Sequence, residues 1–282
     1  MLKYNIPDAT SIDVVADWIE LYVTYLKDNI SKTQVTSYIQ ASKGSDPDDD
    51  FIDSVWATLR HRVGLYGDDS PIVVRGNLIS SNIDWENSPE YLACLIYALE
   101  GNPNTDSASA AVAGKYFERI SNEAVKNYIR GNSLIYGFPN DQNVQDIAIN
   151  HLRELFNYLP PAYRKDRNLD IVAWNPWGDH RASQIILLVQ CAAGANWKTK
   201  IKELNIRAWE KYIHFAANPI KGFSVPVIIS DREMLHEIST DAGVIIDRPR
   251  LYKETFNKNF TDVALRPLLT EWCRNRIAEI NN

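Results

Sequence analysis

Three kinds of polar side chain gather around one predicted β-hairpin in the second half of the chain. Asp170 lies at the start of an apolar strand, and Gln190 ends the next strand after five consecutive apolar residues. Because a hairpin brings the start of its first strand beside the end of its second, we expect these side chains to approach each other. Lys198 and Lys200 follow shortly afterwards. An acid, an amide oxygen and a lysine at one sheet end suit metal-assisted phosphodiester hydrolysis, in which the oxygens hold Mg²⁺ and the lysine polarises water or phosphate.

Each of these residues also has a purely structural interpretation. A carboxylate in an apolar strand is costly unless it is paired, and Asp170 has Lys165 and Arg167 nearby in sequence. Gln190 can be an ordinary amide at a strand end. The lysines that follow can be the solvated face of a basic helix. The residue types alone leave both interpretations open.

The pattern resembles the motif of the PD-(D/E)XK nuclease superfamily, and within it the Mrr-like restriction endonucleases. Those enzymes carry an acid at the start of a strand and, one hairpin later, Glu or Gln, one spacer residue and Lys. Many add a Glu on the preceding helix, often after Phe. The resemblance covers about residues 111–250 and implies that Asp170 and Gln190 bind the metal, with Glu118, which follows Phe117, assisting.

One position departs from the family pattern. The lysine expected two residues after Gln190 is replaced by Ala192, so we expect Lys198 or Lys200 to orient the attacking water. The resemblance implies a Mg²⁺- or Mn²⁺-dependent DNA endonuclease used in restriction or anti-phage defence, acting with a partner protein or as a homo-oligomer. The alternative, which Ala192 favours, is a catalytically degenerate nuclease fold that serves as a binding or scaffold subunit.

Two other sets of residues near the hairpin carry further chemistry. Cys191 could be a nucleophile with His180, His214 or His236 as its base, but a cysteine that ends an apolar strand is more typical of a small buried hydrophobe. Four indoles surround the hairpin and fit either the core or a surface on which bases stack: Trp174, Trp177, Trp197 and Trp209.

Composition sets the wider limits. The 282 residues carry 30 Lys and Arg against 36 Asp and Glu, a net charge of −6, and only three cysteines, which excludes a disulfide framework. No apolar run approaches the roughly 20 residues of a membrane span, and the N-terminus lacks a signal peptide, so we expect a cytoplasmic protein. Residues 151–282 have a net charge of +4 and the rest −10. Either the basic half faces a polyanion, or the acidic half simply has a solvated surface.

The hydrophobic periodicity predicts the elements that position these residues. We expect an α/β fold in which an acidic helical region, residues 1–105, precedes a second domain, residues 106–282. The resemblance implies that this second domain is nuclease-like, with a restriction-endonuclease-like α-β-β-α-β core. Asp247 is expected to pair with Arg248 or Arg250. The expected helices are 11–40, 51–63, 91–99, 111–129, 141–156, 196–217, 231–239 and 261–280, and the expected strands are 169–174, 184–191, 223–230 and 243–247.

Overall fold

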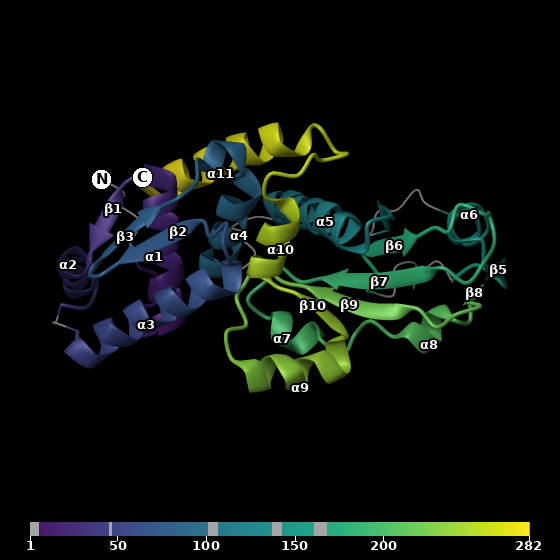
Figure 1. Cartoon of the computed structure of the whole chain (residues 1–282), viewed down its shortest axis with the longest axis horizontal. Helices are drawn as coiled ribbons and strands as arrows, with labels where there is room; N and C mark the ends of the chain where they lie inside the picture. The colour runs from purple at the N-terminus through teal and green to yellow at the C-terminus, as the bar shows by residue number, and fades with distance from the viewer. Residues whose placement is uncertain (1–5, 45–46, 101–106, 137–142, 161–167, 282) are drawn as a thin grey trace. The chain divides into compact units, whose positions relative to one another are not determined.

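The chain divides into two compact units. The computed structural model describes residues 6–44, 47–100, 107–136, 143–160 and 168–281 (Figure 1). Unit 1 comprises residues 1–113 and 248–282, and unit 2 comprises residues 114–247. This division differs from the expected domains of 1–105 and 106–282 because the last 35 residues belong to unit 1. Their helices pack there against α3 and α4.

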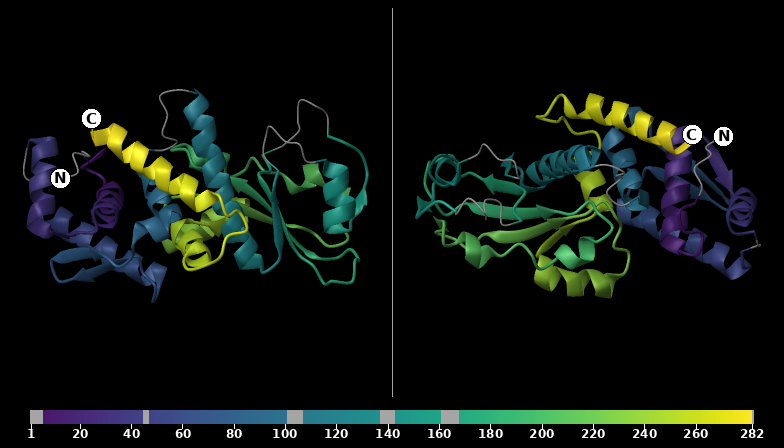
Figure 2. Two further views of the ribbon diagram at one scale, coloured as in Figure 1. Left: turned by 90° about the horizontal axis from the view of Figure 1, so that it is seen from above. Right: turned by 180° about the vertical axis from the view of Figure 1, so that it is seen from behind.

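Unit 1 is mainly helical. Helix α1 (Ile12–Leu26) packs against α3 and α4, and α11 packs along α4 (Figure 2). A small antiparallel sheet has the order β1-β3-β2. The other elements are β1 (Asn29–Ser31), α2 (Lys32–Lys43), α3 (Asp49–Tyr66), β2 (Ile72–Arg75), β3 (Leu78–Ser81), a 3-10 turn η1 (Trp85–Asn87), α4 (Pro89–Glu100), α10 (Arg248–Thr255) and α11 (Leu265–Asn281).

The expected helix over residues 11–40 is interrupted in the middle. Ser11 caps its start by accepting a hydrogen bond from the Val14 N–H, as expected. Lys27 then adopts a left-handed conformation (φ 54°), which ends α1. Ser31 and Gln34 form a capping box that starts α2 afresh. The apolar spacing alone did not reveal this break.

Two arginines are buried in the core of unit 1 together with two carboxylates. Arg62 donates hydrogen bonds to Asp17 and Glu20 at 2.6 and 2.8 Å. Arg248 at the start of α10 donates to Asp17 at 2.5 Å, so Arg248 is paired with the N-terminal helix. Burial alone would raise the pKa of Asp17, but the guanidinium groups of Arg248 and Arg62 hold that pKa below its ordinary value.

Two tyrosine hydroxyls complete this network. Tyr66 and Tyr91 each donate to Glu20, at 3.0 and 2.5 Å, and Arg248 Nε donates to the Tyr66 hydroxyl at 3.0 Å. The network joins α1, α3, α4 and α10 inside unit 1. It therefore fixes the C-terminal segment to helices more than 150 residues earlier in the chain.

The basic C-terminal helix also pairs with acidic residues of unit 1. Arg266, Arg274 and Arg276 of α11 form ion pairs, in that order, with Glu90 at 3.0 Å, Glu86 at 2.5 Å and Glu100 at 2.8 Å. Counted by unit, the chain has 14 basic and 21 acidic residues in unit 1 and 16 and 15 in unit 2. Unit 2 therefore carries a net charge of only +1, and part of the apparent basic half neutralises unit 1.

Unit 2 is built on a mixed five-stranded sheet of order β10-β9-β7-β6-β4. β4 and β7 pair antiparallel with β6, whereas β7, β9 and β10 run parallel. The elements are α5 (Ser107–Ile129), β4 (Asn132–Ile135), α6 (Val144–Asp146), a π-helical turn η2 (Ile147–Leu152), β5 (Leu155–Phe156), β6 (Ile171–Asn175), β7 (Ile185–Cys191), α7 (Trp197–Lys200), α8 (Ile206–Trp209), β8 (Ile213–His214), β9 (Ile220–Ser224), α9 (Arg232–Ala242) and β10 (Val244–Ile246).

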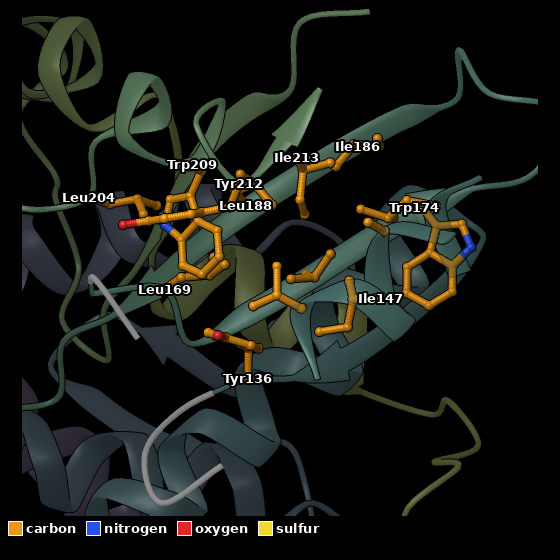
Figure 3. Close-up of a cluster of buried hydrophobic side chains, with 14 residues drawn as sticks. Tyr136, Ile147, Leu169, Trp174, Ile186, Leu188, Leu204, Trp209, Tyr212 and Ile213 are labelled. Carbon is orange, nitrogen blue, oxygen red and sulfur yellow. The ribbon is translucent and has the colours of Figure 1, made fainter. Parts of the chain in front are cut away.

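Both faces of this sheet are covered. On one face Trp174, Ile186 and Leu188 pack against η2 and the α8 segment, as Figure 3 shows. Further along the same face, α7 and α9 cover Phe223 of β9. On the other face Ser121 of α5 hydrogen-bonds Ser224 of β9 at 2.8 Å. The continuous apolar run of β7 reflects this burial on both sides.

The strands predicted at 169–174, 184–191 and 243–247 are confirmed, with shifts of one or two residues at their ends. The strand predicted at 223–230 begins and ends earlier, as β9.

The predicted helix over 196–217 is wrong: two four-residue helices and β8 occupy that stretch. The Asn205 side chain accepts a hydrogen bond from the Ala208 N–H and so caps the start of α8, which is a new helix rather than a continuation of α7. Strand β4 and helix α10 were not predicted. None of the helices in the described ranges is long and apolar enough to cross a membrane.

The buried network of unit 1 gives a stability prediction. Replacing Arg248 with Met leaves the Asp17 and Glu20 carboxylates with one guanidinium instead of two, and breaking such a buried pair costs about 3–5 kcal/mol. We expect the free energy of unfolding, measured by urea denaturation, to fall by that amount. The control is Lys253→Met, an exposed cation on the same helix, which should change stability by less than about 0.5 kcal/mol. Equal stability of the two variants would contradict this assignment.

Candidate functional site

Asp170 lies where the central hairpin begins. Its backbone N–H donates to the Val189 carbonyl at 2.9 Å, and its carbonyl accepts from Tyr136 at 2.6 Å. Its carboxylate accepts the Cys191 N–H at 2.7 Å. The side chain is half-buried, so the carboxylate is held by the end of β7 while still within reach of solvent. Lys165 and Arg167, its sequence neighbours, lie outside the described residues.

Glu118 of α5 approaches the same end of the sheet. Desolvation raises the pKa of the Cys191 thiol well above its ordinary value, and the negative charges of Asp170 and Glu118 raise it further. Both carboxylates therefore lie near one sulfur atom, although 52 residues separate them in sequence. The side chain of Ser121, one turn after Glu118, hydrogen-bonds the same thiol. The two acids named from the sequence therefore both act on the pKa of this thiol.

The same environment bears on Cys191 itself. A thiolate is the nucleophilic form of cysteine, and catalytic cysteines have lowered pKa values. Here burial and two carboxylates act in the opposite direction. Cys191 therefore behaves as the small hydrophobe that its place at the strand end suggested.

Gln190 is committed to other contacts. Its side chain is only 3% exposed. Its amide nitrogen donates to Glu203 Oε2 at 2.9 Å, and its carbonyl oxygen accepts the Leu204 N–H at 3.2 Å. Both partners belong to the connection between α7 and α8. Gln190 therefore anchors this connection to the end of β7, which is the structural alternative considered for a strand-end amide.

The apolar surroundings of Ala192 account for the absence of a lysine at this position. Its side chain is fully buried in an apolar cluster with Trp197, Phe223 and Val225. An ammonium group at this position would be desolvated without a partner, which is strongly unfavourable. A lysine at position 192 is thus incompatible with this packing.

The three lysines after the hairpin differ in their surroundings. Lys198 is exposed, and its Nζ lies 5.7 Å from the centre of the Trp197 ring. Lys200 is half-buried at the end of α7. Lys202 pairs with Asp241 at 3.2 Å. Lys198 and Lys200 lie on α7, directly before the connection that Gln190 holds through Glu203 and Leu204.

The donor set suits a hard divalent cation. Mg²⁺ in proteins is bound through one or two carboxylates, with water and substrate phosphates in the other positions. Glu118 and Asp170 meet that requirement without Gln190. Within the described ranges, no group of three or more His, Cys, Asp or Glu side chains could hold a metal ion. A cation here would therefore depend on water and substrate for most of its coordination.

Sequence reasoning missed Glu203 and Ser121. Glu203 holds the Gln190 amide, and Ser121 contacts the Cys191 thiol. A serine one turn after Glu118 on the same helix face was a usable signal for Ser121. No local pattern signalled Glu203, because the connection that carries it was expected to be continuous helix.

The chain was compared with family models, curated proteins and solved structures, and no match was found in any of the three. The geometry of the site is therefore the basis for the functional conclusion.

The role of Gln190 can be checked by hydrogen exchange. Gln190→Met keeps the volume of the side chain but leaves the buried Leu204 N–H without its acceptor, a loss of about 1–3 kcal/mol. We expect amide exchange over residues 197–209 to become about fivefold faster or more. Gln184→Met is the matched control, because Gln184 is a buried amide just before the other end of β7 and bonds Leu152 instead. An unchanged rate of amide exchange over residues 197–209 in Gln190→Met would show that Gln190 does not anchor this segment.

Proposed function

We propose that unit 2 is a Mg²⁺- or Mn²⁺-dependent endonuclease that hydrolyses phosphodiester bonds of DNA. The observation that supports this proposal is that Asp170 is held at the start of the β6–β7 hairpin by the Cys191 N–H, while the charges of Asp170 and Glu118 both act on the Cys191 thiol. Two acids at the solvent-accessible end of a covered sheet suit a cation bound together with a phosphate.

The order of the elements supports the proposal. Helix α5 is followed by the antiparallel strands β4, β6 and β7, then by α7, β9, α9 and β10. This order includes the helix, hairpin, helix, strand succession that the resemblance to PD-(D/E)XK nucleases implies, with β4 and η2 in addition; Glu118 lies on α5, and Asp170 directly precedes β6. A setting in restriction or anti-phage defence follows from the same resemblance.

In this proposal each residue has a separate task. Asp170 and Glu118 hold the cation, which when bound stabilises charge on the phosphate and lowers the pKa of its water. The Cys191 N–H fixes the orientation of the Asp170 carboxylate. Lys198 or Lys200 neutralises a substrate phosphate or orients the water. Gln190 positions the lysine-bearing segment and does not bind the metal.

A catalytically inactive binding or scaffold subunit is the second candidate. The apolar packing of Ala192 favours it, because the motif lysine cannot be restored at that position. The net charge of +1 on unit 2 also makes its electrostatic attraction to DNA modest. In this case the chain would act with a partner protein or as a homo-oligomer.

Cleavage of supercoiled and linear DNA distinguishes the two candidates. With Mg²⁺ or Mn²⁺ present we expect cleavage by the full chain, and its loss in EDTA. Asp170→Asn keeps an oxygen that accepts the Cys191 N–H but removes a charged ligand, so we expect a rate at least 100-fold lower, as for Glu118→Gln. Glu210→Gln, an exposed acid of unit 2, should cleave like the unchanged protein.

Two results would argue against the nuclease proposal. Cleavage that persists in both Asp170→Asn and Glu118→Gln would show that these acids are not part of the catalytic site. A folded protein that cleaves no DNA with either metal would favour the scaffold candidate.

A further inference from the structure

A cavity of about 310 Å³ opens at the other end of the β6–β7 hairpin, away from Asp170. Its walls come from β4, η2 and the turn between β6 and β7, all within unit 2. Binding sites for small organic ligands begin at about this volume. The residues that line it include His151, Arg153, Trp174, Trp177, Arg181 and Gln184.

Two indoles form the aromatic part of the cavity. Trp174 is buried and packs against the His151 ring at 5.4 Å. Trp177 is 76% exposed, and its Nε1 donates to the Ser183 carbonyl at 3.3 Å. An indole held in place but left open to solvent offers a flat surface on which a planar ring can stack. Of the four indoles around the hairpin, Trp177 alone is exposed; Trp174, Trp197 and Trp209 are buried.

Cationic groups line the same cavity. Arg153 and Arg181 are permanently charged, and Asp179, which pairs with Arg181 at 2.6 Å, offsets one of these charges. His151 and His180 add two further groups that donate hydrogen bonds. Guanidinium groups beside an open aromatic surface are suited to an anion that carries a planar ring.

The turn is held in an unusual conformation. Gly178, His180 and Ser183 all have left-handed backbone angles, with φ of 80°, 59° and 69°. Left-handed angles at two residues other than glycine are unfavourable and persist only where the surroundings impose them. Here the buried Glu154 carboxylate accepts the Ser183 N–H at 3.1 Å and the Ala216 N–H at 2.8 Å. The cavity is therefore preorganised by buried contacts.

The Gln184 side chain borders the cavity and is held in place by one buried hydrogen bond. Its amide nitrogen donates to the Leu152 carbonyl at 2.7 Å, which orients the amide. Its Oε1 is buried and has no hydrogen-bond partner in the described part of the chain. A buried acceptor without a partner is unfavourable. Since this oxygen has less than 1 Å² of exposed surface, a ligand in the cavity does not reach it, and Gln184 contributes only to the shape of the wall.

We propose that this cavity binds a nucleotide, either free or as one unit of a nucleic-acid strand. The base stacks on Trp177, and the phosphate lies between Arg153 and Arg181. The five residues of β6 separate the cavity from Asp170 by about 17 Å, or roughly five base-pair steps of duplex. The cavity is therefore a binding site separate from the candidate metal site and does not depend on cleavage.

Calorimetric titration of the full chain tests this inference. The probes are adenosine monophosphate, a short oligothymidylate and inorganic phosphate, each without divalent metal. We expect at least one nucleotide probe to bind and Trp177→Ala to weaken it about tenfold or more, because stacking is lost. Trp177→Phe keeps a ring and should retain most of the affinity. Arg153→Gln with Arg181→Gln should also weaken binding, whereas Arg207→Gln, an exposed cation on α8, should not.

Each outcome of this titration decides something. Tighter binding of the oligonucleotide supports a strand as the source, and tighter binding of the mononucleotide supports a free ligand. Binding of neither nucleotide, equal affinity for phosphate alone, or affinity unchanged by Trp177→Ala would overturn the inference. Asp170→Asn should bind like the unchanged protein, so a failure of the nuclease proposal leaves this result intact.

Discussion

Strand β7 is paired along both edges and covered on both faces, and this burial determines where unit 2 can place polar chemistry. β6 and β9 take up its backbone hydrogen bonds, while α5 and the α8 and α9 segments exclude water from its faces. Its middle therefore tolerates only apolar side chains. Polar side chains occur at its two ends, Gln184 at one and Gln190 at the other. The candidate metal site and the nucleotide cavity occupy those two ends.

The ion pairs show how charge is distributed between the two units, which the net charges of the two sequence halves do not. The basic residues of the C-terminal segment pair with acidic residues of unit 1, through α11 at the surface and Arg248 in the core. The −10 and +4 of the two sequence halves thus partly cancel inside one unit. In the proposed functions, a polyanion would therefore be attracted to the nearly neutral unit 2 by local groups, such as Lys198 and the arginines of the cavity, rather than by its net charge.

Local sequence patterns predicted the sheet better than they predicted the site. Unbroken apolar runs between turn residues located β6 and β7, because a buried strand has no room for polar side chains. The predicted helix over residues 196–217 is wrong because the hydrogen bond from the Leu204 N–H to Gln190 and the Asn205 cap override the helical spacing of the apolar residues. Asp170 was named from its place at the start of an apolar strand and Glu118 from a family resemblance. The partners of Gln190 and the pairing of Arg248 with Asp17, 231 residues away, depend on the folded chain.

The central claim is that Glu118 and Asp170 converge to hold a divalent cation at the end of the β6–β7 hairpin. Anomalous X-ray diffraction from crystals of the full chain soaked in Mn²⁺ measures this directly. The account predicts an anomalous peak within about 2.5 Å of an oxygen of each carboxylate. A peak bound elsewhere, or ordered carboxylates with no Mn²⁺ between them at millimolar concentration, would contradict it.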